Sequence, residues 1–246
     1  MAANVSYVTF LHRAREFVQA RGIDVSRFPG EHSGLRVVQM LQHSGVTLVL
    51  DVGANDGGYG AELRRFGYEG GIASFEPLTD VFLRLQARSS ADPKWAVTHC
   101  AVGAESGKVQ INVAANGGAS SSLLPMLTAH EKAAPGAKII GTQEVDLRSL
   151  DELWPQVVSP ADTVFLKVDV QGYERQVLQG VDDHLGLVVG VQLELSLVPL
   201  YQGAWPYEEA LSWARDQGFS LRRVIPGFSD PQTGDMLQAD GVFFRN

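Results

Sequence analysis

Residues 47–60 read TLVLDVGANDGGYG, and this stretch decides the fold. Residues 47–52 form an apolar, β-branched run, which is typical of a strand buried on both faces of a parallel sheet. Gly53 and Gly57 then allow positive φ angles and a close approach to a ligand. A helical pattern starts at Tyr59. Strand, glycine turn and helix in this order predict the ligand-binding corner of a doubly wound α/β fold.

The spacing of this turn favours one cofactor over another. A dinucleotide fingerprint, G-x-G-x-x-G, needs a glycine where Asn55 stands. Carboxylates at Asp51 and Asp56 disfavour a pyrophosphate, whereas they would stabilise a cationic sulfonium with an amino-acid tail. The turn therefore predicts S-adenosylmethionine rather than NAD. The plainer alternative is a glycine turn that only packs a helix on a sheet.

Length and composition are those of an ordinary globular protein. The 246 residues suffice for one domain with a full core, and 45% of them are hydrophobic and 20% charged. A formal net charge of −8 disfavours binding to the negatively charged backbone of a nucleic acid. The single cysteine, Cys100, excludes an internal disulfide and a cysteine-only metal cluster.

The sequence also bears on where the protein works. Residues 1–22 lack the apolar core of a signal peptide. No apolar run reaches the length of a membrane span. We therefore expect a cytoplasmic protein with no nucleic-acid partner and no membrane partner.

Strands and helices alternate along the chain after an N-terminal helical extension at residues 1–45. The extension carries helical patterns at 6–20 and 35–43, and residues 46–246 form the predicted main domain. We expect further strands at 72–75, 95–100, 108–114, 163–170, 187–195, 219–225 and 241–244, and helices at 79–88, 150–154, 174–185 and 207–217. Such alternation predicts a parallel, doubly wound sheet. The final two strands have no helix between them, which predicts an antiparallel last strand.

Polar residues that end the predicted strands are candidates for the site, because ligands of open parallel sheets bind at the carboxyl ends of the strands. Glu76 ends the second strand, 25 residues after Asp51, and a carboxylate there can accept both ribose hydroxyls. The alternative is a solvated carboxylate at a helix start. Ala101 and Val102 follow the third strand, where we expect an adenine to meet backbone groups and small apolar side chains.

Two carboxylates and one histidine are candidates for the chemistry. Asp169 and Glu194 end the fourth and fifth strands, so neighbouring strands should bring both near a methyl donor. Methyl transfer from sulfur to a hydroxyl is an in-line displacement that needs a base for the proton. Asp169, Glu194 and His130 are therefore the candidate catalytic residues, and His130 lies in the irregular stretch 117–136.

The same carboxylates allow two other interpretations. Asp169, Glu174 and Glu194 could gather a magnesium ion, which takes oxygen ligands, but their spacing does not demand it and we predict no metal site. A network of ion pairs between Lys167 and the carboxylates is the plainer alternative.

Several motifs together resemble the FkbM family of S-adenosylmethionine-dependent methyltransferases. The most family-specific is K-x-D-x-x-G-x-E, formed by Lys167, Asp169, Gly172 and Glu174. The others are VLDVGANDGGYG at 49–60, FEP at 75–77, CAVG at 100–103, SSSLL at 120–124, FLKVDVQGYERQVLQG at 165–180 and a final DGVFFR at 240–245. The resemblance runs from about residue 46 to the C-terminus, and residues 1–34 lie outside it.

The resemblance implies the class I methyltransferase fold, a Rossmann-like, seven-stranded sheet with an antiparallel last strand. It also implies O-methylation of a hydroxyl on a natural product such as a polyketide, or on a sugar. On the same basis the cofactor would be lined by Asp51, Gly53, Asn55, Gly57, Tyr59, Glu76, Pro77, Ala101 and Val102, with Asp169 at the methyl-transfer site. Gln171 stands where the family more often has glutamate, which counts against a metal site there.

The leading hypothesis is an S-adenosylmethionine-dependent O-methyltransferase whose partner is a small or medium-sized hydroxylated acceptor. Asn55 disfavours an NAD-linked or nucleotide-sugar enzyme on a similar fold. The intact motif residues disfavour a catalytically degenerate cofactor-binding subunit. We expect the acceptor to meet the least patterned stretches, which are the N-terminal helices, 117–136 and 226–240. The N-terminal helices could instead pair two subunits in a homodimer.

Overall fold

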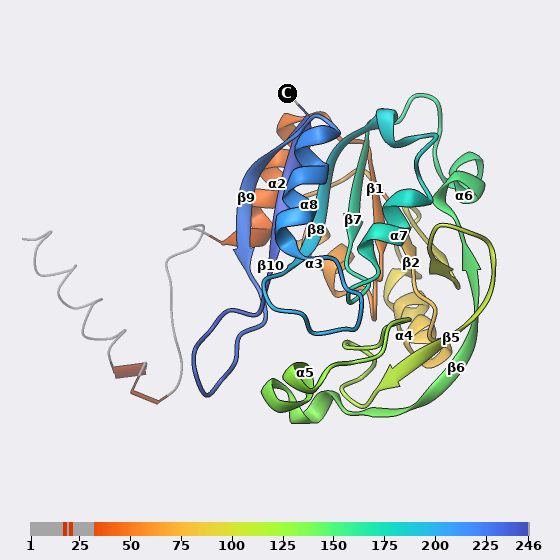
Figure 1. Ribbon diagram of the computed structural model, residues 1–246. Helices are drawn as coiled ribbons and strands as arrows, with labels where there is room; N and C mark the ends of the chain where they lie inside the picture. Colours follow the sequence, from red (N-terminus) through yellow and green to blue (C-terminus); the bar gives the residue numbers. More distant parts are fainter. Residues whose placement is uncertain (1–16, 19, 22–31, 246) are drawn as a thin grey trace, which may run out of the picture.

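The computed structural model describes residues 17, 18, 20, 21 and 32–245. Its main feature is a seven-stranded sheet with the order β3-β2-β1-β7-β8-β10-β9 (Figure 1). The strands are β1 (Leu48–Val52), β2 (Gly71–Phe75), β3 (Trp95–Thr98), β7 (Val164–Val168), β8 (Val188–Ser196), β9 (Phe219–Pro226) and β10 (Gln238–Arg245). The predicted helix at 6–20 lies almost entirely outside the described residues.

The direction of the strands confirms the predicted α/β fold. Neighbouring strands from β3 to β8 are parallel, whereas β10 is antiparallel to both β8 and β9. The last strand is therefore antiparallel, as the sequence predicts, and it lies between β8 and β9. Every residue of β1 and of β7 is buried, because helices cover both faces of the sheet.

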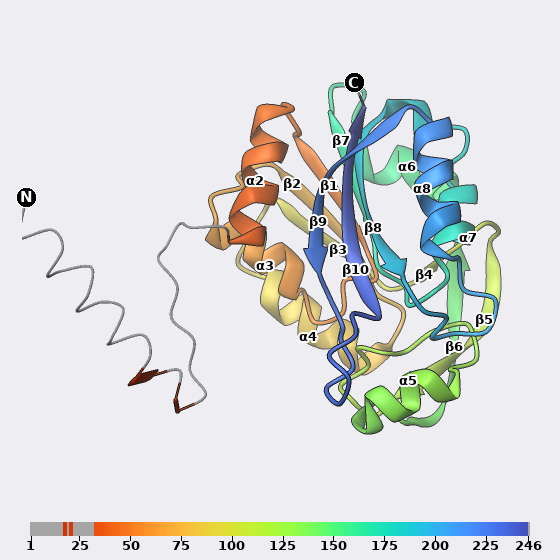
Figure 2. The same ribbon diagram turned by 60° about the vertical axis from the view of Figure 1, so that its left-hand side comes forward.

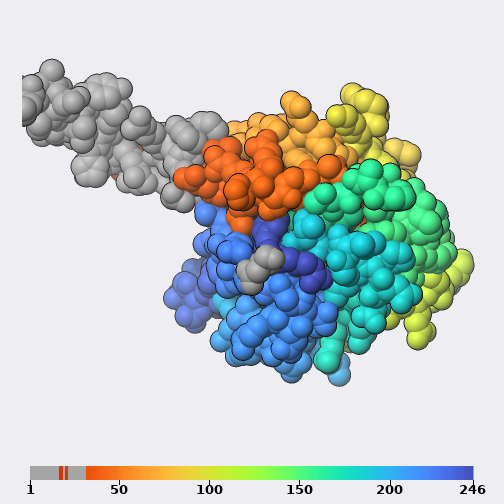
Figure 3. Space-filling model, turned by 90° about the horizontal axis from the view of Figure 1, so that it is seen from above, coloured from red at the N-terminus to blue at the C-terminus, as the bar shows by residue number. Residues whose placement is uncertain are grey.

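Helices cover both faces of the sheet (Figure 2). On one face, apolar side chains of α2 (Ser33–His43), α3 (Gly58–Arg65) and α4 (Thr79–Ser89) pack against the sheet. On the other, α6 (Leu150–Val157), α7 (Glu174–Gln179) and α8 (Tyr207–Asp216) do so. Seen from above, α2 lies in orange-red beside the blue C-terminal part of the chain (Figure 3).

A second, three-stranded sheet lies beside the carboxyl ends of the main strands. It contains β4 (Ala101–Val102), β5 (Gly107–Ala114) and β6 (Ile139–Arg148) in the order β4-β6-β5. The structure confirms the predicted extra strand at 108–114 as β5, whereas β6 was not predicted. The stretch 117–136 contains a short helix, α5 (Thr128–Ala133).

The prediction of a helix over 174–185 is wrong in its second half. Helix α7 ends at Gln179, and Gly180 follows as its cap. A Cβ atom on Gly180 would lie 2.0 Å from the carbonyl oxygen of Gly103. The close approach of these two backbone segments therefore needs a glycine at 180 and ends the helix there. A short 3-10 helix, Leu185–Leu187, then leads into β8.

None of the helices in residues 17, 18, 20, 21 and 32–245 combines the length and the apolar character that a bilayer crossing requires.

Candidate active site

A cleft opens at the carboxyl ends of β1, β2 and β7, beside the second sheet. One part of its wall is apolar and the other carries polar side chains. The apolar part contains Phe75, Leu78, Ala101, Val102, Ile111 and Leu123. The polar part contains Asn55, Glu76, Asp169 and Gln171. The cleft therefore lies where the sequence places the ligand of the sheet.

The glycine turn after β1 brings two strand ends together. Gly53 has a φ of +74°, and its N–H donates to the carbonyl oxygen of Phe75 at 3.1 Å. A Cβ atom on Gly53 would lie 1.9 Å from the backbone oxygen of Asp169. Only glycine permits both this φ angle and this approach. The turn thus fixes the end of β1 against the end of β7.

Glu76 lies at the floor of the cleft with both carboxylate oxygens held by backbone groups. The N–H of Asn55 donates to Oε2 at 3.0 Å and the N–H of Leu78 to Oε1 at 2.9 Å. Burial raises the pKa of Glu76 to about 7, although these two N–H groups and the nearby Lys167 favour the charged form. Each carboxylate oxygen can still accept from a ligand hydroxyl.

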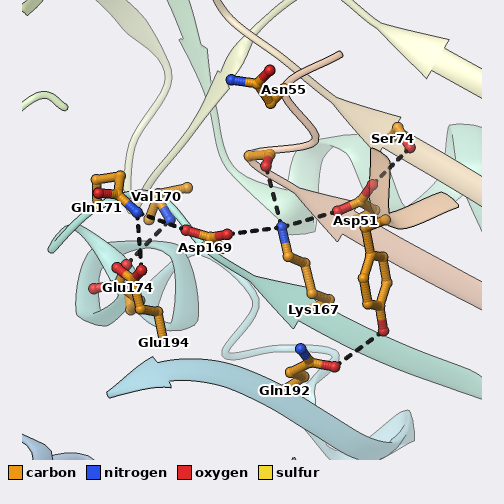
Figure 4. A network of polar contacts seen from close by, with 12 residues as sticks. Asp51, Asn55, Ser74, Lys167, Asp169, Val170, Gln171, Glu174, Gln192 and Glu194 are labelled. Atoms are coloured by element: carbon orange, nitrogen blue, oxygen red, sulfur yellow. Dashed lines mark hydrogen bonds and ion pairs between the residues drawn. The ribbon is translucent and has the colours of Figure 1, made fainter. Parts of the chain in front are cut away.

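Lys167 lies at the centre of a buried polar network beneath the cleft (Figure 4). Its Nζ donates to the carbonyl oxygen of Gly53 at 3.2 Å and lies 3.2 Å from Asp51 Oδ1 and 3.4 Å from Asp169 Oδ2. Burial acts to lower the pKa of Lys167, but the Asp169 and Asp51 carboxylates outweigh it and raise that pKa above its usual range. Lys167 therefore stays charged at neutral pH.

Seven of the ten residues predicted to bind the cofactor line this cleft. They are Gly53, Asn55, Glu76, Pro77, Ala101, Val102 and Asp169.

Asp51, Gly57 and Tyr59 lie elsewhere. Asp51 is fully buried and accepts from Ser74 Oγ at 3.1 Å. Gly57 caps the start of α3 with a φ of +85°. The hydroxyl of Tyr59 donates to Gln192 Oε1 at 3.2 Å. These three residues shape the strand–helix corner rather than the cleft wall.

The structure brings two of the three candidate catalytic residues together. Asp169 follows β7 directly, and Glu194 lies within the neighbouring strand β8. The amide of Gln171 bridges the two carboxylates. His130 is buried apart from the cleft lining, with its Nε2 3.2 Å from Ser120 Oγ and its ring edge-on to Tyr201. Burial lowers the pKa of His130, so the neutral ring is favoured.

The side chain of Glu174 stabilises the backbone turn after β7. Its Oε1 accepts from the N–H groups of Val170 at 3.1 Å and Gly172 at 3.0 Å, which closes the turn after β7. Within the described part of the chain, no three His, Cys, Asp or Glu side chains are grouped so that they could hold a metal ion.

Part of the cleft wall comes from the stretch 117–136, in which the sequence singles out no cleft residue. Gly118, Ala119, Ser121 and Leu123 line the cleft from the loop before α5. Tyr201 also contacts the site through Gln171, from 30 residues further along the chain. The serine-rich motif at 120–124 was the available signal for the loop, whereas no pattern marked Tyr201.

The residues of the cleft fit S-adenosylmethionine. The apolar wall suits a flat purine, and the buried carboxylate of Glu76 suits a pair of donating hydroxyls. The carboxylate of Asp169, on the polar side of the cleft, would stabilise a positive charge such as that of the cofactor's sulfur. Bound there, S-adenosylmethionine supplies an electrophilic methyl group on a cationic sulfur.

Comparison with solved structures finds similar chains of low sequence identity. Fibrillarin of Aeropyrum pernix, solved with S-adenosyl-L-methionine, shares 11% identity over 81% of this chain and 66% of its own, with a TM-score of 0.44. Magnesium protoporphyrin IX methyltransferase of Synechocystis PCC 6803, also with bound cofactor, shares 15% identity over 87% of this chain and 78% of its own, with a TM-score of 0.46. The methyltransferase domain of bacterial CtHen1 shares 13% identity over 85% of this chain and 95% of its own, with a TM-score of 0.46.

The family comparison is more specific. A search of curated proteins found no match. Residues 51–221, which include the glycine turn, Glu76, Asp169 and Glu194, match the sequence model of the methyltransferase FkbM domain. The chain therefore belongs to the FkbM family of methyltransferases, and its cofactor is S-adenosylmethionine.

Proposed function

We propose that the protein transfers a methyl group from S-adenosylmethionine to a hydroxyl of a small or medium-sized natural product, of polyketide type or a sugar. The observation that carries this proposal is the pair of carboxylates at the ends of neighbouring strands. Asp169 lines the cofactor cleft, and Glu194 lies beside it across the Gln171 bridge. The motif resemblance to O-methylating FkbM proteins supports the acceptor class.

A hydroxyl acceptor suits this pair of carboxylates. An alcohol is a weak nucleophile until a base takes its proton, and a positioned carboxylate is one of the side chains that does so. The only cysteine has no comparable role, because burial raises the pKa of the Cys100 thiol to about 12 and keeps it protonated. Lys167 is held charged by Asp51 and Asp169, so it cannot accept a proton.

The first test is isothermal titration of the purified protein with S-adenosylhomocysteine, with and without magnesium. We expect binding in the micromolar range without magnesium. The second test incubates the protein with methyl-labelled S-adenosylmethionine and a panel of hydroxylated polyketides and sugars, with the Asp169→Asn variant as a control. Label in an ether product that survives mild base supports O-methylation.

Two results would contradict the proposal. Binding of S-adenosylhomocysteine without any methyl transfer would favour a catalytically degenerate cofactor-binding subunit. Transfer to nitrogen or carbon acceptors only would assign a different methyltransferase chemistry to the same cleft.

A further inference from the structure

The backbone of Gln171 is held in an unusual conformation at the mouth of the cleft. Its φ is +58°, in the left-handed region that costs a non-glycine residue on the order of 1 kcal/mol or more. Glu174 accepts from the N–H groups on either side of it, Val170 and Gly172. Ser122 Oγ donates to the carbonyl oxygen of Gln171 at 2.7 Å. These contacts fix the residue independently of its side chain.

The side-chain amide of Gln171 has every polar atom engaged, and Figure 4 shows its contacts with the two carboxylates. Its Nε2 donates to Asp169 Oδ1 and to Glu194 Oε1, each at 3.0 Å. Its Oε1 accepts from the hydroxyl of Tyr201 at 2.8 Å. The opposite amide orientation would place Oε1 against two carboxylates, so the network admits only this one.

This arrangement makes the two carboxylates unequal. Asp169 has both oxygens engaged, Oδ1 by Gln171 and Oδ2 by the ion pair with Lys167. Glu194 has Oε1 held by Gln171, whereas its Oε2 is buried without a hydrogen-bond partner among the residues that the structure describes. A buried carboxylate oxygen without a donor is costly unless a ligand supplies one. Glu194 Oε2 is therefore the oxygen of the pair that lacks a donor, which a ligand hydroxyl can supply.

Charges from several elements act on Glu194. Burial raises its pKa well above the usual range, and the carboxylates of Asp169 just after β7, Glu174 on α7 and Asp240 on β10 raise it further. The hydrogen bond from Gln171 lowers that pKa by stabilising the charged form. The Gln171 amide thus offsets part of this rise and favours the anionic form that a proton acceptor must have.

We propose that Gln171 is a positioning residue that holds Glu194 as the proton acceptor for the hydroxyl being methylated. The inference rests on the proposed O-methyl transfer. In that step the acceptor O–H bond breaks and its proton passes to Glu194 Oε2. The oxygen electron pair forms the new bond to the methyl carbon, while the bond between sulfur and methyl breaks with its electrons left on sulfur.

The first experiment reads the ionisation of Glu194 without any acceptor. Protein with ¹³C-labelled glutamate carboxyls, saturated with S-adenosylhomocysteine, is titrated by NMR, and the Glu194→Gln variant identifies the Glu194 signal. We expect Gln171→Ala to move the Glu194 midpoint upward by half a pH unit or more. Tyr201→Phe, which frees the amide to rotate, should move it in the same direction by less. Gln179→Ala, at an exposed position on α7, should leave it unchanged.

An unchanged midpoint in Gln171→Ala, with wild-type affinity for S-adenosylhomocysteine, would overturn the positioning role. A purely structural role for Gln171 would lower thermal stability without moving the midpoint.

The second experiment uses an acceptor that the wild-type protein methylates. Glu194→Gln should lower kcat by 100-fold or more with cofactor affinity unchanged, as expected for loss of a general base. In Gln171→Ala the rise of kcat with pH should shift upward together with the NMR midpoint. Glu194→Gln with a wild-type kcat would overturn the proposal. Failure of the proposed function appears differently, as absence of methyl transfer by the wild-type protein, and it would remove the catalytic role of Glu194 as well.

Discussion

Lys167 and Asp51 form a buried ion pair directly beneath the cleft. Nζ lies 3.2 Å from Oδ1, and the side chains are 7% and 0% exposed. The two residues are paired in register on β7 and β1, the two central strands that meet under the site. The acidic residue of the glycine motif therefore acts in this structure by anchoring Lys167, which in turn holds the carbonyl oxygen of Gly53.

Removing Lys167 should destabilise the fold strongly. Lys167→Ala leaves the Asp51 carboxylate buried without its partner, and breaking a buried pair costs about 3–5 kcal/mol. Urea unfolding of the variant measures this loss. The matched control is Lys108→Ala, because Lys108 pairs with Glu144 at an exposed site and its removal should leave the urea midpoint unchanged. Similar midpoints for the two variants would show that the buried pair contributes no more than a surface pair.

The affinity for S-adenosylhomocysteine should depend on the ionisation of Glu76. Its pKa is about 7 in the unliganded protein, and hydroxyl donors from the ligand favour the charged form. Below pH 7, binding therefore requires that Glu76 lose its proton. The affinity for S-adenosylhomocysteine should rise about tenfold between pH 6 and pH 8. Calorimetry at the two pH values measures this. Glu76→Gln should bind more weakly with no such rise, and a flat wild-type profile would exclude Glu76 as the ribose acceptor.

The sequence predicts which residues end the strands but not where their side chains point. Apolar runs ending in Asp51, Glu76, Asp169 and Glu194 could be identified because both faces of these strands are buried. That Asp51 faces Lys167 depends on the register between β1 and β7, which no single run contains. The sequence therefore predicts a site at the strand ends, where the cleft lies, but it assigns Asp51 to the lining, and Asp51 is buried beneath.

Other features could not be predicted from the sequence, because their sequence patterns are weak or their contacts join residues far apart in the chain. Strand β6 reads IIGTQEVDLR, and only Val145 and Leu147 in it are buried. Its alternation of apolar and polar residues is therefore too short to distinguish it from a loop. The contact of Tyr201 with Gln171 joins segments 30 residues apart. His130 was a candidate catalytic residue because it lies in an irregular stretch, whereas its ring packs against Tyr201 and Phe228.

Glu174 should make stability fall as pH rises. Burial raises its pKa from 4.5 in the unfolded chain to about 7 in the folded protein, so its stabilising contribution is complete below about pH 4.5 and is lost as pH rises through 7. Glu174→Gln keeps an oxygen that accepts from Val170 and Gly172 but cannot ionise. Relative to this variant, the wild-type protein should lose on the order of 1–3 kcal/mol between pH 5 and pH 8.

Urea unfolding at the two pH values checks this expectation. Glu174→Ala is the control for the hydrogen bonds, and it should be destabilised at both pH values because two backbone N–H groups lose their acceptor. Parallel pH profiles of the wild-type protein and Glu174→Gln would mean that Glu174 stays ionised when buried.

Replacing Gly53 should show that the meeting of β1 and β7 depends on the absence of a side chain. Gly53→Ala adds a Cβ atom 1.9 Å from the backbone oxygen of Asp169, which cannot rotate away, at a φ of +74°. Gly67→Ala isolates the cost of the φ angle, since Gly67 has a φ of +90° with nothing within 4 Å of an added Cβ. We expect a loss of roughly 1 kcal/mol in unfolding free energy for Gly67→Ala. Gly53→Ala should lose several times more, together with its affinity for S-adenosylhomocysteine, because separating the two strand ends also displaces Asp169. Equal losses in urea unfolding, with cofactor affinity retained by both variants, would show that the strand ends can separate without damage to the site.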